Sequence, residues 1–257
     1  MNLVTYSVSE RIAFITLNRP EKRNALNPEL VTALMTAFTQ AENDEHVRVV
    51  ILKANGDAFC AGADLAYLHE LQHFSFEENL KDSGKLKDLF LKIYSLKKII
   101  IAQVQGHALA GGCGLTNVCD FVFSVPEAKF GYTEVKIGFV PALVSVFLLR
   151  KVGEQKAKQL LLTGDPVQGD DAIHAGLVNH MVDKNELEST VLKFAQKLIK
   201  GNSGQSLALT KKLIADVQLL KLDDALQLAA RVNAEARGTD DCKKGIAAFL
   251  NKQELSW

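Results

Sequence analysis

The sequence predicts an α/β fold with a mostly parallel sheet, followed by a helical C-terminal region. Before Ala142, apolar runs rich in β-branched residues, such as 47–52 and 99–104, alternate with segments whose apolar residues recur every three or four positions. Strands that alternate with helices are typical of right-handed βαβ crossovers, which produce a parallel sheet. From Ala142 onward strand-like runs become scarce and helical segments predominate.

The composition is that of a globular protein with a sizeable core and no net charge. Hydrophobic residues make up 47% of the 257 residues, and 30 basic side chains balance 30 acidic ones. A neutral chain gives no electrostatic reason to expect a nucleic-acid partner. No apolar run approaches the roughly 20 residues that a membrane-spanning helix needs, and the N-terminal residues show no secretory signal. We therefore expect a soluble cytoplasmic protein.

The cysteines predict reduced thiols, with neither disulfides nor a metal site. Cys60, Cys113, Cys119 and Cys242 stand in apolar or small-residue settings and lack the paired spacing of zinc ligands. The glycine fingerprint of dinucleotide-binding proteins is absent as well, so no redox cofactor is implied.

The N-terminal elements follow from local patterns. Residues 4–6 and 11–17 have the β-branched and aromatic content of a hairpin. The pair Asn27-Pro28 marks a helix start, because the amide can cap the helix and proline fits its first turn. That helix is predicted over 29–42. Residues 47–52 form a nearly continuous apolar run, as expected for a strand buried on both faces.

The middle of the chain continues the alternation. A polar and irregular segment is expected to extend to about residue 78, and a helix with apolar residues three and four apart covers 86–96. Residues 99–104 and 121–125 are predicted strands. Between them, residues 106–119 begin with glycines and alanines and continue as a helix-like segment.

The C-terminal part is expected to consist mainly of helices, with one strand-like segment at 177–182. The helices are predicted at about 153–162, 169–175, 186–200, 206–219, 223–236 and 240–251.

Two small-residue loops and one acid are the candidate catalytic parts. Ala61-Gly62-Ala63 and Ala110-Gly111-Gly112 each follow a strand-like run. A strand that meets small residues and then a helix leaves backbone N–H groups free to hold a negatively charged oxygen. Glu134 lies in a largely apolar loop, where burial would raise its pKa toward the range suited to proton transfer. These are the parts of a site that stabilises an oxyanion and moves a proton.

A series of motifs gives the chain a family resemblance. In order they are LNRPEKRNAL, AFCAGADL, GHALAGGCGL, CDF, AKFGYTEVKIG, LLTGDPV and AGLVNHMV. In this combination the sequence resembles the enoyl-CoA hydratase/isomerase (crotonase) family. The resemblance implies a crotonase-like (ClpP/crotonase) spiral of ββα units, with residues 1–195 as the core and 196–257 as a helical trimerisation region. It also implies an acyl-CoA thioester as substrate, no separate cofactor, and a homo-trimer or hexamer.

The resemblance assigns roles to individual residues. The N–H groups of Ala63 and Gly111 are expected to bind the thioester oxygen, and Glu134 falls on the position of the family's second catalytic glutamate. The positions that contact CoA in the family are occupied here by Lys22, Arg23, Ala25, Ala61, Asp64 and Leu65, with Phe249 and Lys252 reaching CoA from a neighbouring subunit. Asp64 is also expected to cap the helix after its loop.

Each assignment has an ordinary structural alternative. Ala63 and Gly111 could be small for tight packing alone. Glu134 could be a surface residue paired with Lys129 or Lys136, and the cationic side chains could be ordinary solvated charges. For the two loops and Glu134, the motifs in family order favour the functional interpretation.

One departure from the family pattern bears on the reaction. Hydratases of the family normally carry a first catalytic glutamate three residues after the oxyanion glycine, and this chain has Gly114 there. The glycine-rich stretch that usually follows the next turn is replaced by bulkier residues at 142–145. Both changes are expected to dry the pocket. His107 could stand in for the missing acid, although a lone histidine there is more often structural.

Several functions therefore remain open. The resemblance along the whole chain favours an enoyl-CoA hydratase, a lyase acting on a 2-enoyl-CoA in fatty-acid or branched-chain amino-acid degradation. Gly114 favours a 3-to-2 enoyl-CoA isomerase, since one base can move a proton between Cα and Cγ. A non-catalytic acyl-CoA-binding scaffold is a further alternative. RNA binding, known for some family members, has little support from a neutral chain.

Overall fold

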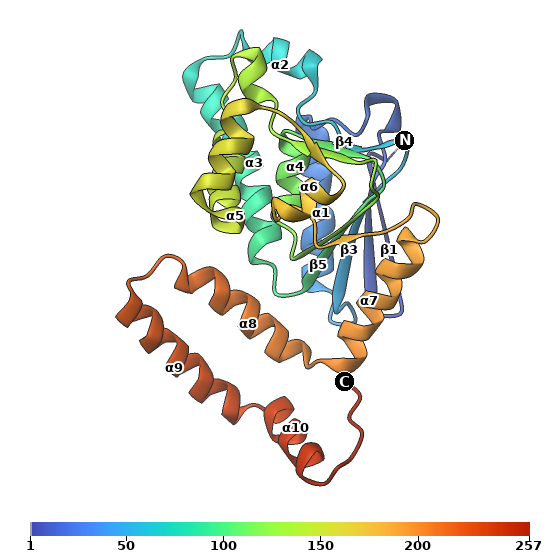
Figure 1. Cartoon of the computed structure of the whole chain (residues 1–257), viewed down its shortest axis with the longest axis vertical. Helices are drawn as coiled ribbons and strands as arrows, with labels where there is room; N and C mark the ends of the chain where they lie inside the picture. The colour runs from blue at the N-terminus through green and yellow to red at the C-terminus, as the bar shows by residue number, and fades with distance from the viewer. Residues whose placement is uncertain (1) are drawn as a thin grey trace.

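The computed structural model describes residues 2–257 as two sheets surrounded by helices (Figure 1). The larger sheet has six strands in the order β1-β2-β3-β5-β7-β10. Its first two strands form the predicted antiparallel hairpin and all its other pairings are parallel, so the parallel sheet is confirmed. The strands are β1 (Val4–Ser9), β2 (Ile12–Leu17), β3 (Val49–Ala54), β5 (Ile99–Val104), β7 (Phe121–Ser124) and β10 (His180–Met181).

A second sheet of four short strands was not predicted element by element. In it β4, β6 and β8 run parallel, and β9 pairs antiparallel with β8. Each of the first three follows a strand of the larger sheet, so that strand pairs followed by helices form the expected spiral of ββα units. Strands this short carry too little alternation to detect in a sequence. They are β4 (Ala58–Cys60), β6 (His107–Leu109), β8 (Lys129–Gly131) and β9 (Val167–Gln168).

Helix starts show where local signals succeeded and failed. Helix α1 (Pro28–Asn43) begins as predicted, with the Leu30 N–H donating to Asn27 Oδ1 at 3.0 Å. The irregular segment expected before residue 78 was wrong, because α2 (Leu65–Leu71) and the start of α3 (Phe76–Ser95) occupy it. Ser75 and Glu78 form a capping box that starts α3 inside a polar stretch.

The helices from residue 142 onward follow the prediction with one correction. The helix predicted at 153–162 is the second half of α5 (Ala142–Thr163), which continues across a break at Gly153. Two further helices of this part are α6 (Asp170–His174) and α7 (Leu187–Gly201). Earlier in the chain lie the helix α4 (Gly111–Asn117) and two 3₁₀ turns, η1 (Pro20–Lys22) and η2 (Glu134–Ile137).

The core lies between the larger sheet and the helices that cover it. Phe38 on α1, Ile51 on β3, Phe90 on α3 and Ile101 on β5 are all fully buried in one continuous apolar cluster. Burial of each such side chain contributes about 1.5–3 kcal/mol. This packing fixes the strand ends from which the site loops extend.

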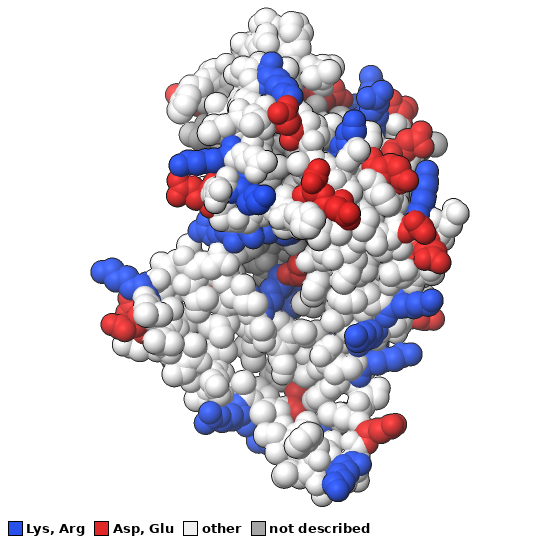
Figure 2. Space-filling model, in the orientation of Figure 1, with Lys and Arg blue, Asp and Glu red and all other residues white. Residues whose placement is uncertain are grey.

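The last three helices lie apart from the core, as Figure 1 shows. Helices α8 (Gly204–Val217) and α9 (Leu222–Gly238) bury no residue within this chain, and α10 (Asp240–Leu250) exposes 84% of Phe249. Figure 2 shows a hollow between them and the rest of the molecule, on a face where basic and acidic side chains are interspersed. Exposed apolar surface of this kind is typical of protein–protein interfaces. Among residues 2–257, no helix is both long and apolar enough to cross a membrane.

Candidate active site

The site is built where two adjacent strands of the smaller sheet end. Because β4 and β6 are parallel neighbours, the loops that follow Cys60 and Leu109 emerge at the same edge. A Cβ added to Gly62 would lie 2.8 Å from the Ala110 Cβ and 3.6 Å from the Gly111 nitrogen. The two small-residue loops predicted from the sequence are therefore in contact.

Tight packing explains some of the small residues in these loops. It does not account for the two predicted donors, Ala63 and Gly111, to the same degree. Gly62 has a φ of +94° and Ala110 a φ of +49°, both in the left-handed region. A Cβ on Gly112 would lie 2.2 Å from the Cys60 carbonyl oxygen, a backbone atom that cannot move away. A Cβ on Gly111 would meet only the end of the Leu26 side chain, at 3.0 Å. Steric need is thus strongest at Gly62 and Gly112.

The N–H groups of Ala63 and Gly111 have no acceptor within residues 2–257. Gly111 is the first residue of α4, where N–H groups lack an intrahelical partner. Ala63 is flanked by backbone groups that pair with Leu26, whose N–H donates to Gly62 O at 2.7 Å and whose carbonyl accepts from the Asp64 N–H at 2.9 Å. The loop is thus held on both sides of Ala63 while its own N–H stays free.

An ion pair fixes the same loop. Arg19 Nη1 donates to Asp64 Oδ2 at 2.6 Å and to the Ala25 carbonyl at 3.1 Å. Asp64 Oδ1 accepts the Ala66 N–H at 2.9 Å, so this residue caps α2 as predicted. Burial alone would raise the pKa of Asp64, but the hydrogen bonds from Arg19 and Ala66 outweigh burial and hold that pKa below its usual value. Both carboxylate oxygens therefore have structural partners.

Glu134 is buried next to these loops. It begins η2, just after β8, and the Gly131 carbonyl of β8 accepts the Ala110 N–H at 2.7 Å. Glu134 is only 9% exposed, and its Oε2 has no hydrogen-bond partner within residues 2–257. Burial raises its pKa. The alternative of a surface glutamate paired with lysine is wrong, since Lys136 pairs instead with Asp165 at 2.7 Å.

Apolar side chains fill the position of the absent acid. A Cβ on Gly114 would lie 2.5 Å from Val144 Cγ1 and 3.0 Å from Phe90 Cζ. Val144 belongs to the first turn of α5, the bulkier segment noted in the sequence. Both side chains are buried, at 4% and 0% exposure. This side of the site is therefore lined by apolar side chains, which supports the expectation of a dry pocket.

Sequence reasoning missed a buried hydroxyl in the site. Tyr132 is fully buried, and its hydroxyl forms no hydrogen bond of ordinary geometry within the described residues. Its polar neighbours are the Cys113 thiol and the Glu134 carboxyl; burial, then these two groups, raise the pKa of Tyr132. From the sequence, only a largely apolar loop around Glu134 was described, and Tyr132 had no assigned role.

The predicted CoA-contacting residues fall into two groups. Lys22 and Arg23 are exposed beside the Ala63 loop, since the Arg23 carbonyl accepts the Ala61 N–H at 3.0 Å. In the same region Ala25 is buried and Leu65 is 75% exposed. Phe249 and Lys252 lie on and just after α10, at the opposite end of the molecule from α2 (Figure 1). A single chain does not bring these two groups together.

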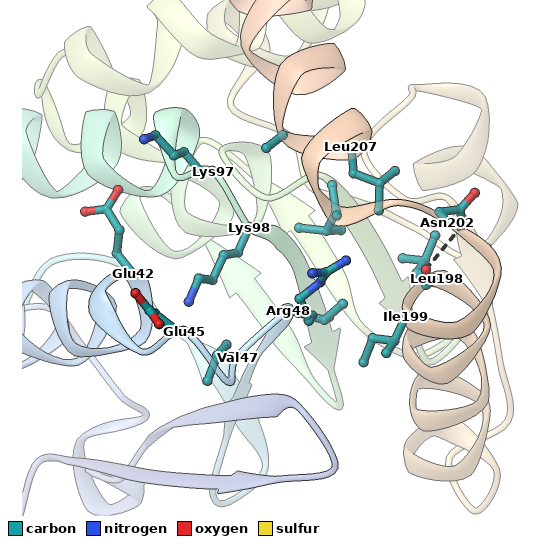
Figure 3. Close-up of a pocket in the computed structure, with 14 residues that line it drawn as sticks. Glu42, Glu45, Val47, Arg48, Lys97, Lys98, Leu198, Ile199, Asn202 and Leu207 are labelled. Atoms are coloured by element: carbon teal, nitrogen blue, oxygen red, sulfur yellow. Dashed lines mark hydrogen bonds between the residues drawn. The ribbon is translucent and has the colours of Figure 1, made fainter. Parts of the chain in front are cut away.

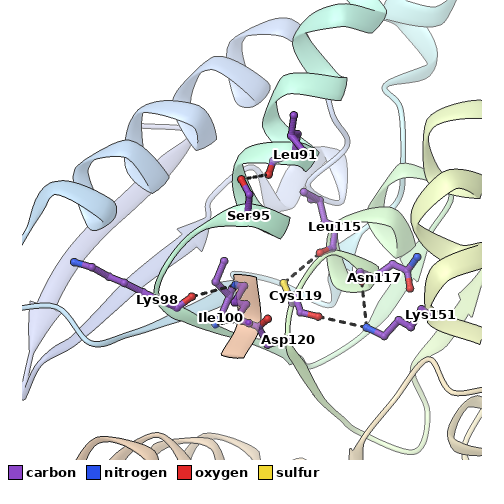
Figure 4. Close-up of polar contacts among 10 residues, drawn as sticks. Leu91, Ser95, Lys98, Ile100, Leu115, Asn117, Cys119, Asp120 and Lys151 are labelled. Carbon is purple, nitrogen blue, oxygen red and sulfur yellow. Dashed lines mark hydrogen bonds and ion pairs between the residues drawn. The ribbon is translucent and has the colours of Figure 1, made fainter. Parts of the chain in front are cut away.

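His107, the possible substitute for the missing acid, and Asp120 both have structural partners. His107 is exposed at the start of β6, and its Nδ1 accepts the Lys129 N–H at 3.2 Å, whereas the site lies beyond the other end of that strand. Asp120 lies beside Ile100 (Figure 4) and accepts its N–H at 2.7 Å. Asp120 also accepts a hydrogen bond from Lys211 at 2.7 Å, which ties the start of β5 to α8. Asp120 therefore has a structural role.

A cavity of about 310 Å³ lies away from this site (Figure 3). It adjoins Val49 and Ile99, the first residues of β3 and β5, whereas the site loops follow the C-terminal ends of strands. The Lys98 ammonium at its wall donates to the carbonyls of Ala41 and Asp44. In the part of the chain that the structure describes, no group of three or more His, Cys, Asp or Glu side chains could hold a metal ion.

Comparison with known proteins agrees with this geometry. A family model described as Enoyl-CoA hydratase/isomerase matches residues 7–257. The chain is 45% identical to a Thermus thermophilus protein named "Putative enoyl-CoA hydratase", over 94% of this chain and 95% of that protein. It is 35% identical to a crotonyl-CoA hydratase of Syntrophomonas wolfei, over 96% and 95%. The crystal structure of a Mycobacterium smegmatis enoyl-CoA hydratase superposes with a TM-score of 0.92 at 33% identity, over 99% and 98%. The chain belongs to the enoyl-CoA hydratase/isomerase family and has the crotonase fold.

Proposed function

We propose that the protein is an enoyl-CoA hydratase, which adds water to a 2-enoyl-CoA thioester. The observation that carries the proposal is the meeting of two loops with unpaired N–H groups, at Ala63 and Gly111, beside a buried glutamate with an unpartnered oxygen. The names of the similar Thermus and Syntrophomonas proteins support water addition as the reaction.

The bond-making steps use these groups, the substrate and one water molecule. The thioester oxygen accepts hydrogen bonds from Ala63 and Gly111, which polarises the conjugated double bond. Glu134 takes a proton from water as the water oxygen bonds to Cβ, and the displaced electrons form an enolate on the thioester oxygen. Glu134 then gives the proton to Cα, and a 3-hydroxyacyl-CoA results. Each N–H donor is worth about 3 kcal/mol in the transition state.

The raised pKa of Glu134 suits this double role. A carboxyl group that both accepts and returns a proton works best when its pKa lies near the working pH. Burial moves the pKa of Glu134 in that direction.

The second candidate function is a 3-to-2 enoyl-CoA isomerase, and the surroundings of Gly114 favour it. Val144 and Phe90 occupy the space of a second acid and offer no hydrogen bond to water. A double-bond shift needs no water, because Glu134 can remove a proton from one carbon and return it to another.

The CoA site and the assembly are proposed from the family resemblance. Lys22 and Arg23 would meet CoA phosphates as charge-assisted donors, beside Ala25, Ala61, Asp64 and Leu65. Phe249 and Lys252 would complete the site of a neighbouring subunit. We propose residues 1–195 as the core and 196–257 as the region that forms a trimer or hexamer, which the exposed apolar side chains of α9 and α10 support. We propose a cytoplasmic location from the unpaired cysteines, and a place in fatty-acid or branched-chain amino-acid degradation from the family resemblance.

The test compares two substrates with one variant. Purified protein is assayed on crotonyl-CoA and on a 3-enoyl-CoA, and Glu134→Gln serves as the control. Loss of the conjugated enoyl absorbance of crotonyl-CoA, abolished by the substitution, is expected. Gain of that absorbance from the 3-enoyl substrate alone would establish the isomerase. Binding of acyl-CoA with no turnover of either substrate would indicate the scaffold.

A further inference from the structure

We propose that the Tyr132 hydroxyl holds the reacting water together with Glu134, in place of the glutamate that this chain lacks. The inference rests on the proposed hydratase function and deepens it by naming a second group in the same site.

Two buried polar atoms in one short segment have no partner. They are the Tyr132 hydroxyl oxygen and Glu134 Oε2, on residues that are 0% and 9% exposed. Roughly 90% or more of buried polar groups in native proteins are hydrogen-bonded. Two unpartnered groups at alternate positions of one segment therefore indicate a water or substrate atom that completes both.

The strand register places Tyr132 beside the first turn of α4. Strand β8 pairs with β6 through Leu109 and Gly131, so Tyr132 follows directly beside the first turn of α4. The Cys113 thiol of α4, one residue before Gly114, neighbours the hydroxyl. Tyr132 therefore has both Cys113 of α4 and Glu134 of η2 as polar neighbours.

Pairing with Cys113 does not account for the hydroxyl. Burial raises the pKa of the Cys113 thiol to about 11, so the thiol is neutral at physiological pH. A neutral thiol is a weak donor and a weak acceptor. Val144 and Phe90, which close the space at Gly114, offer no polar atom.

A neutral phenol fits the task of holding water without taking its proton. Burial, the neighbouring thiol and the Glu134 carboxyl keep Tyr132 protonated. Its hydroxyl can donate a hydrogen bond to the water oxygen, or accept a hydrogen bond from one water O–H. The proton of the other water O–H is transferred to Glu134. The C–O bond then forms at Cβ, the water O–H bond breaks, and Glu134 returns the proton to Cα. Tyr132 itself ends the cycle unchanged.

The test uses Tyr132→Phe, with Cys113→Ala as a matched control that removes the neighbouring thiol. Two reactions are measured. Hydration of crotonyl-CoA needs the water, whereas exchange of the Cα protons of butyryl-CoA with deuterium oxide needs only the carbonyl donors and Glu134. We expect Tyr132→Phe to lower the kcat of hydration by about 100-fold and to leave KM and Cα exchange within about threefold. Cys113→Ala is expected to preserve both reactions.

The outcomes separate this inference from the proposed function. If the unmodified protein hydrates crotonyl-CoA and Tyr132→Phe does so equally well, Tyr132 does not hold the water. If Tyr132→Phe and Cys113→Ala lose both reactions alike, the pair serves packing and the inference fails. If the unmodified protein exchanges Cα protons but hydrates nothing, the hydratase proposal fails and this inference with it.

Discussion

The close approach of Val144 to Gly114 predicts that the effect of Gly114→Ala on the free energy of unfolding changes sign when Val144 is shortened. Gly114→Ala places a Cβ 2.5 Å from Val144 Cγ1 and 3.0 Å from Phe90 Cζ. In the unmodified chain we expect this substitution to destabilise the protein. In a Val144→Ala background, where Cγ1 is absent, we expect the same substitution to stabilise it.

The magnitudes follow from two opposing effects. Adding a methyl group to a packed core typically costs about 1–3 kcal/mol, whereas replacing glycine by alanine inside a helix gains about 1 kcal/mol. Gly114→Ala alone should therefore cost up to about 2 kcal/mol. Val144→Ala alone removes two methyl groups and should cost about 1.6 kcal/mol for lost burial, with a further cavity term. Once Cγ1 is gone, the Phe90 contact is the remaining restraint, so Gly114→Ala should gain up to about 1 kcal/mol.

The free energy of unfolding is measured by urea denaturation of the four proteins. Protein concentration is held constant, because any assembly of subunits contributes to apparent stability. A coupling energy of about 1–3 kcal/mol is expected. Costs that add within about 0.5 kcal/mol would show that Val144 does not close the space at Gly114, and the argument for a dry side of the site would fail.

Three further predictions concern the site and the thiols. Because burial raises the folded-state pKa of Glu134, the folded protein binds this proton more tightly than the unfolded chain, so the carboxyl lowers stability as pH rises above its unfolded pKa of about 4.3. Glu134→Gln should therefore raise the free energy of unfolding at pH 7 while abolishing turnover, and equal stability at pH 7 would contradict this. Gly62→Ala should cost about 1–3 kcal/mol, because it forces φ +94° on a residue with a Cβ, and should lower kcat at least tenfold by moving the Ala63 N–H; unchanged kcat would count against that donor. Iodoacetamide at pH 8, followed by mass spectrometry, should label Cys242 first. Burial raises the pKa of the other three thiols, those of Cys60, Cys113 and Cys119, to about 11 or 12. Early labelling of any of these three would contradict their burial.

Local signals predicted the parts of the fold that local physics determines. The Asn27 cap, the apolar strand at 99–104 and the burial of Glu134 all depend on a few neighbouring residues. The strands β4, β6 and β8 depend on pairing between segments far apart in the chain, and three residues carry no periodic signal. Asp64 marked the start of α2, but the segment after it was still expected to be irregular, because its exposed and mixed residues lack an apolar face.

The site divides in the same way. The motifs placed the two donor loops and Glu134, but the filling of Gly114 by Val144 and Phe90 is a contact among three helices that no single stretch of sequence displays. The Tyr132 hydroxyl lacks a hydrogen-bond partner within the described residues, and this can be seen only once the packed structure is known.

The choice between hydratase and isomerase depends on whether polar atoms of the site can bind a water molecule. On the Gly114 side, Val144 and Phe90 leave no polar atom to bind it. Just after β8, Glu134 Oε2 and the Tyr132 hydroxyl are both buried and both unpartnered within the described residues. An isomerase needs only the carboxyl, and a tyrosine hydroxyl buried without a partner would then be a cost with no compensating role. In the proposed hydratase with one carboxylate, Tyr132 would supply a second, neutral group to hold the water. The unpaired hydroxyl is therefore the feature that favours water addition over the double-bond shift.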